Sequence, residues 1–353
     1  MFVYISIYGL LAMLGASTTA RSASGAMLAL VALPLVLFMG TRLETGCDFS
    51  GYLHRFELLY NDATFFNVIR REEPGFHLLN WLVMELDLGY MWVNILASSI
   101  YVYCIFKFSK LSARPILLIA LFFPILIVQL GMSGLRQALA TGFLMLALVE
   151  FVSGNRLKTA LYILVGALFH QSVIIMLPLA LVAGRQITLS RLLIALVVLG
   201  PLAFVILGER AEVYNNRYVA QVYGENSSSG ALLRYGLAAL PFLFLVKYRN
   251  KVKSAHPQIF NLMWVFSFIC FAMLPLAFLS TVALHRMVYY ILPVSSLALI
   301  SVASVVFAQR DRQMASYFPI LLYGSYIVVW FSLSRHANLC YTPYDSYLFG
   351  YFL

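Results

Sequence analysis

Long apolar runs separated by short polar breaks fill the chain from Phe2 to Leu333. A helix of about 20 residues crosses a hydrocarbon core of about 30 Å, and these runs repeatedly approach that length. The first run, Phe2 to Ala16, follows no basic segment, so we interpret it as a membrane span rather than a signal peptide. The pattern predicts an all-α polytopic integral membrane protein with a single transmembrane domain over residues 1–353.

Two polar interruptions make this pattern irregular. The first lies near Phe169, His170 and Gln171, inside an apolar segment whose single crossing would place the next basic loop on the wrong side. We expect two short helices that meet there in a re-entrant arrangement. The second interruption, at residues 86–89, predicts a short helix on the outer surface before the next span. With both, the chain has about eleven or twelve transmembrane helices and both termini outside.

The basic residues predict the orientation, because Lys and Arg resist translocation across a membrane. Alternating loops place all six lysines inside, whereas the basic residues left outside are all arginines. These are Arg42, Arg55, Arg70, Arg71, Arg136, Arg210, Arg217, Arg234, Arg286 and Arg335. Arg offers a planar fork of donors that binds phosphate or carboxylate at two points, so this outer face suggests anion recognition. Contact of single Arg side chains with lipid headgroups or acids remains an alternative.

The composition agrees with a membrane protein and removes other classes. The chain is 62% hydrophobic and 11% charged, which leaves too little polar surface for a soluble globule. The formal net charge of +10 does not indicate a nucleic-acid partner, because the charges are scattered over loops. The four cysteines show neither CxxC spacing nor metal-ligand neighbours, although a Cys47–Cys340 disulfide outside remains an alternative.

Two long segments are predicted outside the membrane, residues 41–74 and residues 208–231, and both exceed an ordinary helix–helix connection. The first has side chains at helical spacing, namely Tyr52, Phe56, Leu59 and Tyr60. We therefore expect a helix that lies on the membrane surface. The second contains Arg210 and Arg217 before a Ser-rich stretch, and we expect it to form a mobile loop over the site.

Arg136 follows a turn of small residues, Gly131–Gly134, in the first turn of a helix that runs inward. A helix N-terminus carries a partial positive charge, so a cation there is unfavourable unless an anion lies between them. Free N–H groups and a guanidinium together predict a diphosphate site. Arg234 and Arg286 open two other inward-running helices in the same way. The alternative is that these arginines only extend to the outer interface.

His170 is predicted at membrane depth, where an unpaired ionisable group is costly to bury. Near neutral pH a histidine can accept a proton from a sugar hydroxyl, which makes His170 a candidate base. A neutral histidine that ties two short helices together is the alternative.

The outer segments supply further candidate substrate-binding residues. Glu73 precedes Pro74 at a predicted helix start, and Asn80 follows within the same helix. Helix initiation alone would also explain the acid. Polar and aromatic residues pair at i, i+4 spacing in Asp48 with Tyr52 and in Arg286 with Tyr290. Such pairs suit sugar rings and also suit an interfacial aromatic belt.

Several catalytic motifs are absent from the sequence. It has no Walker A, GxSxG or HExxH motif and no Asp-rich magnesium cluster, which argues against ATP hydrolysis and zinc proteolysis. A metal-independent transfer without a cofactor fits this inventory, with Arg balancing the charge of a leaving diphosphate.

Read in order, six segments resemble the EpsG-like branch of the Wzy polysaccharide polymerases, the O-antigen polymerase family. They are Asp48–Tyr52, Glu73–Asn80, Leu135–Ala140, Phe169–Ser172 with Leu177–Pro178, His285–Tyr290 and Thr342–Tyr344. The resemblance implies a multi-helix fold related to O-antigen ligases and lipid-dependent, GT-C-like glycosyltransferases. It also implies the transfer of a growing chain on undecaprenyl diphosphate to a new lipid-linked unit at the periplasmic face of the bacterial inner membrane.

By this resemblance Arg136 holds a diphosphate and His170 is the candidate base. Arg286, Arg210 and Arg217 help to hold the second diphosphate or the loop above it. Independently of these roles, Arg234 and His285 are further candidate substrate-binding residues. The partners expected are the undecaprenyl-diphosphate-linked oligosaccharide and membrane lipids, with a chain-length regulator as a further candidate.

Two alternative functions remain open. An O-antigen ligase uses the same donor with a lipid A core acceptor, and the sequence separates the two only by motif order. A flippase of lipid-linked sugar also needs a cationic cavity. A transporter, however, is expected to show inverted repeats and polar residues at the midplane or on both faces, whereas the ionisable residues here crowd one face.

Overall fold

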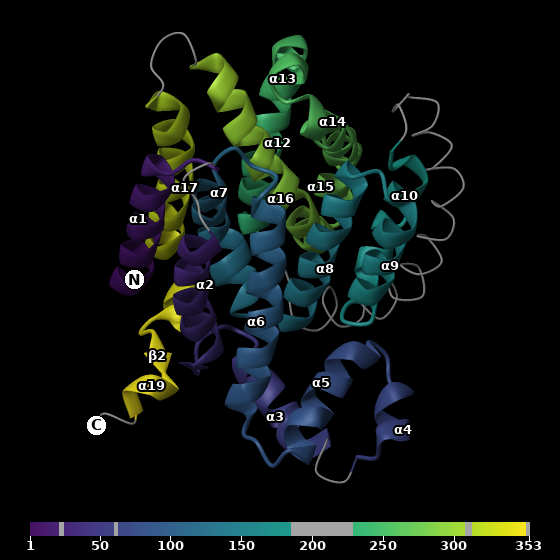
Figure 1. Ribbon diagram of the computed structural model, residues 1–353. Helices are drawn as coiled ribbons and strands as arrows, with labels where there is room; N and C mark the ends of the chain where they lie inside the picture. Colours follow the sequence, from purple (N-terminus) through teal and green to yellow (C-terminus); the bar gives the residue numbers. More distant parts are fainter. Residues whose placement is uncertain (21–24, 60–62, 185–228, 308–312, 351–353) are drawn as a thin grey trace.

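The computed structural model describes residues 1–20, 25–59, 63–184, 229–307 and 313–350. Nearly all of these residues are helical, and the longest helices run side by side through the molecule (Figure 1). A small lobe of α3, α4 and α5 lies at one end of this bundle, and α13 lies at the other. The structure confirms the predicted all-α membrane fold.

The first half of the chain begins in the bundle, forms the lobe with α3, α4 and α5, and returns to the bundle at α6. Its elements are α1 (Phe2–Ser17), α2 (Gly25–Gly40), β1 (Arg42–Leu43), α3 (Phe49–Leu59), α4 (Phe65–Ile69), α5 (Pro74–Glu85), α6 (Tyr90–Ser109), α7 (Pro115–Phe122), the π-helix η1 (Phe123–Gly131), α8 (Leu135–Val152), α9 (Arg156–Ala167), the 3₁₀ helix η2 (Gln171–Met176) and α10 (Leu179–Val182). The second half adds α12 (Ser229–Lys247), α13 (Arg249–Ala255), α14 (Pro257–Ala272), α15 (Leu276–Leu279), α16 (Thr281–Val306), α17 (Met314–Leu333), α18 (Arg335–Tyr341), β2 (Asp345–Ser346) and α19 (Tyr347–Gly350).

Six helices of the described chain are long and apolar enough to cross a membrane: α6, α8, α12, α14 with its continuation to Phe278, α16 and α17. Shorter apolar helices accompany them at α1, α2, α7 with η1, and η2 with α10. The predicted total of eleven or twelve crossings also draws on residues 185–228, which lie outside the described residues.

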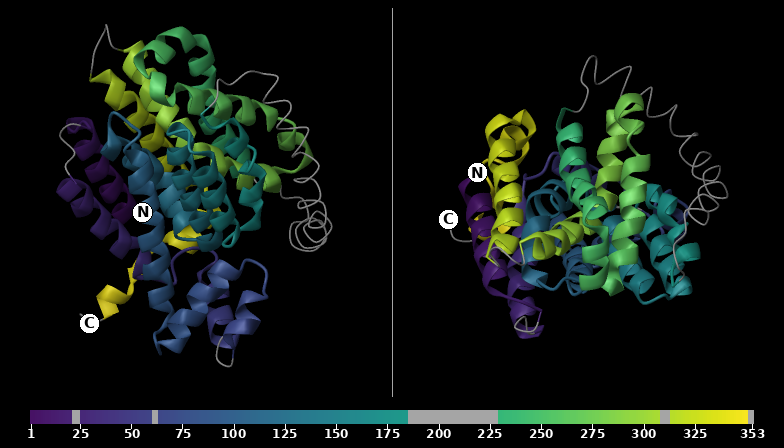
Figure 2. Two further views of the ribbon diagram at one scale, coloured as in Figure 1. Left: turned by 45° about the vertical axis from the view of Figure 1, so that its right-hand side comes forward. Right: turned by 90° about the horizontal axis from the view of Figure 1, so that it is seen from above.

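Segments from the two ends of the sequence meet within the bundle. Helix α1 packs against α17, and the Tyr4 hydroxyl donates a hydrogen bond to the carbonyl oxygen of Tyr341 at 2.8 Å. Seen from above in Figure 2, the earliest and latest helices share one side of the bundle, and α9 lies on the opposite side. The beginning and the end of the described chain are therefore on the same side of the bundle.

One helix of the bundle is covered by protein on every face. All residues from Pro115 to Gly131, in α7 and η1, are buried, which explains why this stretch is apolar without any polar stripe. Its second half is a π-helix, a wide helical form that is rare and often found at functional sites. Pro124 lies at the start of η1 and lacks a backbone N–H, so the regular α-helical hydrogen bonding cannot continue through it.

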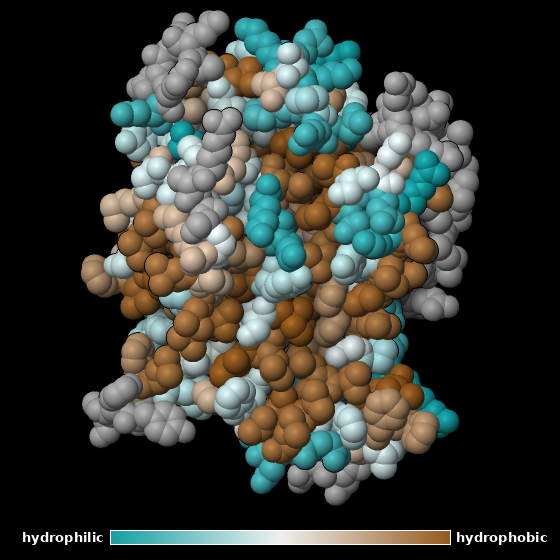
Figure 3. Space-filling view, in the orientation of Figure 1, coloured by the Kyte–Doolittle hydropathy of each residue, from teal (hydrophilic) through white to brown (hydrophobic). Residues whose placement is uncertain are grey.

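The charges are separated along the bundle as predicted. The lysines lie where α6 and α12 end, where α9 begins, and in α13. Figure 3 shows hydrophilic residues gathered at the α13 end and a hydrophobic band across the middle of this face. Helices α8, α12 and α16, which carry Arg136, Arg234 and Arg286 near their N-termini, begin at the opposite end.

Both predicted interruptions are present. Helix α9 ends at Ala167, and η2 begins at Gln171. The chain then turns back, as shown by the close approach of Gly184, which follows α10, to Gly154, which precedes α9: a Cβ atom on Gly154 would lie 3.2 Å from the Cα of Gly184. The hairpin thus enters and leaves on one side, as a re-entrant element does. The second interruption separates α5 from α6 around Asp87, whose φ of 53° lies in the left-handed region.

The apolar face of α3 differs from the prediction. We expected it to lie on the membrane surface, but Tyr52 and Phe56 are buried inside the protein. The ring centroid of Tyr52 lies 5.4 Å from that of Phe76 in α5, and Phe56 lies 5.7 Å from Tyr90 in α6. Helices α5 and α6 supply aromatic partners for this face, so protein rather than lipid covers it.

Arg42 is one of the arginines predicted on the outer face, but it is buried. Its side chain is fully buried, and its guanidinium donates hydrogen bonds to the carbonyl oxygens of Thr45 and Met39. Residues 39 and 45 flank the C-terminal end of α2. The last carbonyl groups of a helix have no hydrogen-bond partner within the helix, and a cation can supply one. Arg42 therefore binds main-chain carbonyl groups at the end of α2 in this fold, and its side chain is not exposed on the outer face.

The loop after α2 is fastened to the C-terminal segment. Strand β1 pairs antiparallel with β2, and a disulfide joins Cys47 to Cys340, which settles the alternative left open by the sequence. The backbone N–H of Gly46 donates to the carbonyl oxygen of Cys340 at 2.7 Å. Gly46 has a φ of +103° and packs directly against the carbonyl oxygen of Met132, just before α8.

Gly46→Ala is expected to destabilise the protein by roughly 2 kcal/mol or more, because the new Cβ atom would meet the Met132 carbonyl from a backbone conformation that favours glycine. Thermal unfolding of the purified protein in detergent measures the effect. Gly51→Ala, in α3, is the matched control, since nothing lies within 4 Å of its Cβ position. Equal melting temperatures for the two variants would contradict this account.

Candidate functional site

The carboxylate of Glu73 joins three segments that are far apart in the sequence. Its Oε2 lies 2.6 Å from Nη1 of Arg136 in α8, and its Oε1 lies 2.7 Å from Nδ1 of His170 at the tip of the re-entrant hairpin. The backbone N–H of Gln171 also donates to Oε1, at 3.3 Å. Both of these ion pairs use Glu73.

The local backbone explains why Glu73 points into the bundle. Pro74 begins α5, and Glu73 precedes it with a φ of 57°, a left-handed conformation that costs free energy for a residue other than glycine. Its side chain makes no capping hydrogen bond to α5. The N–H of Gly75 instead donates to the carbonyl oxygen of Leu168 at 2.8 Å. Helix α5 is thus fastened to the hairpin tip, and the strained residue holds its carboxylate between Arg136 and His170.

The charges around Glu73 keep it ionised. Burial by itself would raise its pKa, but the hydrogen bond and the charge of His170, followed by Arg136 and the Gln171 N–H, lower the pKa of Glu73 to about 2. An ionised carboxylate only accepts hydrogen bonds, so Nδ1 of His170 must carry the proton that it shares with Glu73. In a neutral ring, Nε2 is then the nitrogen with a free lone pair.

A second histidine lies one turn into α5. Burial, together with the positive charges of Arg71 and Arg136, lowers the pKa of His77 to about 4. At neutral pH His77 is therefore uncharged. The cationic character of this part of the site comes from its arginines.

Arg136 occupies the place that the sequence predicted, at the second residue of α8, and its side chain is 34% exposed. The negative group next to this helix N-terminus is Glu73, which the sequence argument did not pair with it. The guanidinium carbon also lies 5.9 Å from the ring centroid of Tyr52. Burial raises the pKa of the Asp48 carboxyl, and Ser133 in the turn before α8 and the charge of Arg136 act against this rise. Asp48, Tyr52, Glu73 and Arg136 therefore belong to one neighbourhood.

Arg234 belongs to a second, buried cluster that the sequence did not predict. Its Nη1 donates to Oε1 of Gln129 at 2.9 Å, and Gln129 also shares a hydrogen bond with the Tyr326 hydroxyl. Nε of Arg234 is buried without a hydrogen-bond partner, as is Nδ1 of His285 in α16. In the sequence, only the single glutamine inside the apolar run from Pro115 to Gly131 indicates that a buried polar cluster is present here.

Other predicted substrate-binding residues have different surroundings. Asn80 is buried and donates to the Phe76 carbonyl of its own helix at 2.7 Å. Tyr290 is fully buried, and its hydroxyl lies 2.7 Å from that of Ser172. Neither offers a surface to a sugar in this structure, since each is already bonded within the protein. The backbone carbonyl of Arg286 accepts a hydrogen bond from Gln137 at 2.7 Å, which links α16 to α8. Arg210 and Arg217 lie outside the described residues.

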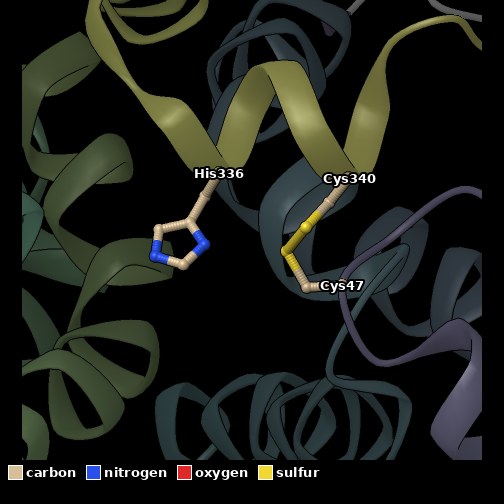
Figure 4. Close-up of side chains that lie close together, drawn as sticks. All are labelled: Cys47, His336 and Cys340. Carbon is tan, nitrogen blue, oxygen red and sulfur yellow. A yellow bond between two sulfur atoms is a disulfide. The ribbon is translucent and has the colours of Figure 1, made fainter. Parts of the chain in front are cut away.

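One group of His and Cys side chains lies close together beside the Cys47–Cys340 disulfide, in which the two sulfur atoms are bonded to each other. Cys47, His336 and Cys340 each offer one ligand atom, and these atoms all lie within 4.8 Å of one another (Figure 4). His336 and Cys340 are four residues apart on α18 and therefore lie one above the other on the same face of the helix.

Comparison with known proteins gives one match. The model of the EpsG family matches residues 25–346. No curated protein and no solved structure matches the chain.

Proposed function

Because the chain belongs to the EpsG family, we propose that it polymerises lipid-linked oligosaccharide repeat units at the periplasmic face of a bacterial inner membrane. The growing chain on one undecaprenyl diphosphate would pass to the terminal sugar of a second lipid-linked unit. The protein would act as a metal-independent glycosyltransferase in which side chains, without a cofactor, supply the charge and the base.

The observation that carries this proposal is the position of Glu73 between Arg136 and His170. Through Nδ1 the carboxylate orients the imidazole of His170, so Nε2 can accept a proton. The same carboxylate fixes a guanidinium that has five N–H donors, of which Glu73 Oε2 occupies only one side. A base and an anion-binding group are thus held together at the outer end of the bundle, which is the pairing that glycosyl transfer from a diphosphate requires.

The proposed reaction uses these groups in one displacement. Nε2 of His170 takes the proton of the acceptor hydroxyl as its oxygen forms a bond to the anomeric carbon of the donor. The bond between that carbon and the diphosphate oxygen breaks, and Arg136 balances the charge of the departing undecaprenyl diphosphate. Glu73 stabilises the imidazolium that forms, as a carboxylate does for a catalytic histidine elsewhere.

Two features support an outward-facing site. The lysines gather at the opposite end of the bundle, which is typical of the cytoplasmic side. The disulfide between Cys47 and Cys340 lies in the segments next to the site, and such bonds persist in oxidising compartments such as the periplasm. Both features are independent of the family match.

Stepwise products would distinguish the proposed polymerase from the other two functions. Purified protein is incubated with lipid-linked repeat units alone, and the products are separated on a gel. A ladder spaced by one repeat unit supports a polymerase. A ligase would yield no ladder without a lipid A core acceptor, and a flippase would leave the units unchanged, so either result would contradict the proposal.

In this assay His170→Gln is expected to lower the rate of ladder formation by about 10²- to 10⁴-fold, because the amide cannot take the hydroxyl proton. The matched control is His54→Gln, an exposed histidine of α3 that should remain near the wild-type rate. A His170→Gln rate within a few fold of wild type would mean that His170 only ties the hairpin to α5.

A further inference from the structure

Four basic side chains gather where α12 ends and in the short helix α13. Lys247 is the last residue of α12, and Arg249, Lys251 and Lys253 lie in α13. All four are exposed. Helix α13 lies at the end of the bundle opposite to the lobe of α3, α4 and α5 (Figure 1). These four residues are called the α13 basic cluster.

No carboxylate of the described chain balances this charge. The sequence has no Asp or Glu from residue 226 to residue 310, so α12, α13, α14 and α16 contain none. Within the described residues, no ion pair involves a member of the α13 basic cluster. Positive charge that is concentrated without a counter-charge attracts anionic partners.

Other arginines at this end of the bundle are used to fasten helices together. Nη1 of Arg114 donates to the carbonyl oxygen of Ala16 at 2.9 Å, and Nε of Arg156 donates to that of Ala183 at 3.1 Å. Among the described residues, no such hydrogen bond engages a side chain of the α13 basic cluster. The donors of the cluster therefore remain open to an external anion.

The α13 basic cluster lies at the level of lipid headgroups. Directly before it, α12 exposes the apolar side chains of Leu243, Phe244 and Val246. Figure 3 shows the hydrophilic α13 end above the hydrophobic band that crosses this face. The guanidinium carbon of Arg249 lies 5.7 Å from the ring centroid of Trp264 in α14, and tryptophan is enriched at membrane interfaces. One surface thus combines cations with the apolar side chains just below them.

The backbone of α13 is held in place by its neighbours. Val252 is fully buried, and its N–H donates to the carbonyl oxygen of Tyr248 at 3.0 Å. After α13, Nε2 of His256 lies 2.9 Å from Oγ of Ser304 in α16. Lys251 and Lys253 flank the buried Val252, so a fixed element carries their ammonium groups. An anion that binds here does not have to order this backbone first, which favours binding.

We propose that the α13 basic cluster is a docking site for the phosphodiester headgroups of anionic phospholipids in the adjacent leaflet. Arg249, Lys251 and Lys253 would donate to the phosphate oxygen atoms, and the apolar side chains of α12 would contact the acyl chains of the same lipid. This second contact favours a lipid over an acidic protein segment, which would match the cations only. The inference is independent of the proposed polymerase activity. It assigns a counter-charge to a group of cations that has none in the described chain.

The background for the test is Trp81→Phe, Trp92→Phe and Trp330→Phe, which leaves Trp264 as the only one of the four tryptophans. Its ring lies beside Arg249, so quenching of its fluorescence reports on lipid at the cluster. The purified protein is placed in phosphatidylcholine nanodiscs that contain a rising fraction of phosphatidylglycerol with brominated acyl chains. Brominated phosphatidylcholine is the comparison for headgroup charge. Half-maximal quenching is expected at a phosphatidylglycerol fraction about tenfold lower than that of brominated phosphatidylcholine.

Lys251→Gln with Lys253→Gln should raise this phosphatidylglycerol fraction by about fivefold or more, because each lost charge weakens the attraction. The matched control is Lys107→Gln with Lys110→Gln, two exposed lysines at the end of α6. This pair loses the same charge from the same end of the bundle and should stay within about twofold of wild type. Lys251→Arg with Lys253→Arg keeps the charges and should keep the wild-type fraction, which separates lost charge from an altered fold.

Equal quenching by the two brominated lipids would overturn the proposal. An unchanged fraction in Lys251→Gln with Lys253→Gln, or an equal rise in the two lysine-to-glutamine pairs, would also overturn it. Polyglutamate peptide is added in a final titration and is expected to leave the quenching unchanged. Relief of the quenching by the peptide would assign the surface to an acidic protein segment instead.

Discussion

Glu73→Gln is expected to lower the kcat of polymerisation by about 10²- to 10⁴-fold. The amide has no charge to pair with Arg136, and its NH₂ group can face Nδ1 of His170, which would favour the tautomer whose proton is on Nε2. The base would then be turned into a donor at the atom that must accept the proton. The measurement is the initial rate of ladder formation from lipid-linked repeat units, per mole of folded protein.

Glu72→Gln is the control for Glu73→Gln, since it makes the same change one residue earlier on an exposed side chain. Normal folding is checked separately, because removing one partner of a buried ion pair also destabilises a protein. A well-folded Glu73→Gln variant with wild-type kcat would show that the carboxylate does not orient the base.

The same carboxylate predicts how stability depends on pH. The pKa of Glu73 is lowered to about 2 by His170 and Arg136 despite burial, so the charged form is favoured in the folded state. Its contribution to the free energy of unfolding is fully present above the ordinary pKa near 4.5 and is lost as the pH falls from there toward 2. Wild type should therefore lose more stability than Glu73→Gln over this acidic range.

Arg136→Ala is expected to abolish polymer formation, with a loss of at least about 10³-fold, because the leaving diphosphate then has no guanidinium at the N-terminus of α8. In cells, single repeat units should still reach the lipid A core, since their transfer would not need this protein. Arg136→Lys keeps the charge but loses the planar fork that Glu73 and a phosphate can share, so we expect it to recover only part of the rate.

The control for this pair is Arg70→Ala, an exposed arginine that follows α4. Removal of one positive charge from the same face should have little effect on the rate if the position of Arg136 matters rather than the net charge. Long-chain product from Arg136→Ala, or an equal loss in Arg70→Ala, would contradict the assigned role.

Much of the fold could be predicted because the lipid environment restricts which segments can cross the membrane. Residues in a membrane core must be apolar and helical, so the apolar runs predict the helices, and the polar break at His170 predicts the re-entrant turn. The surface of α3 could not be predicted in this way. Its face is equally apolar whether lipid or protein covers it, and only the positions of Phe76 and Tyr90 decide between the two.

The sequence predicted single candidate residues of the site but not which of them contact one another. Arg136, His170 and Glu73 were each chosen for a separate reason: a cation at a helix N-terminus, an ionisable group at membrane depth, and an acid at a helix start. Glu73 was expected to bind substrate, whereas its two oxygen atoms hold Arg136 and His170. Gln129 was missed because a single amide in an apolar run carries no indication of which side chain it bonds.

The sequence by itself determined a helical membrane protein with its lysines at one end. Both features depend on single segments of the chain: the length of each apolar run determines whether it can span the membrane, and each basic loop resists translocation across it. Tertiary structure alone decided that Arg42 and Tyr290 are buried and bonded within the protein. It also decided that Cys47 meets Cys340, and that one carboxylate joins α5, α8 and the hairpin. These contacts depend on how helices distant in sequence pack, and each side chain's role is set by the partner that packing brings within about 3 Å.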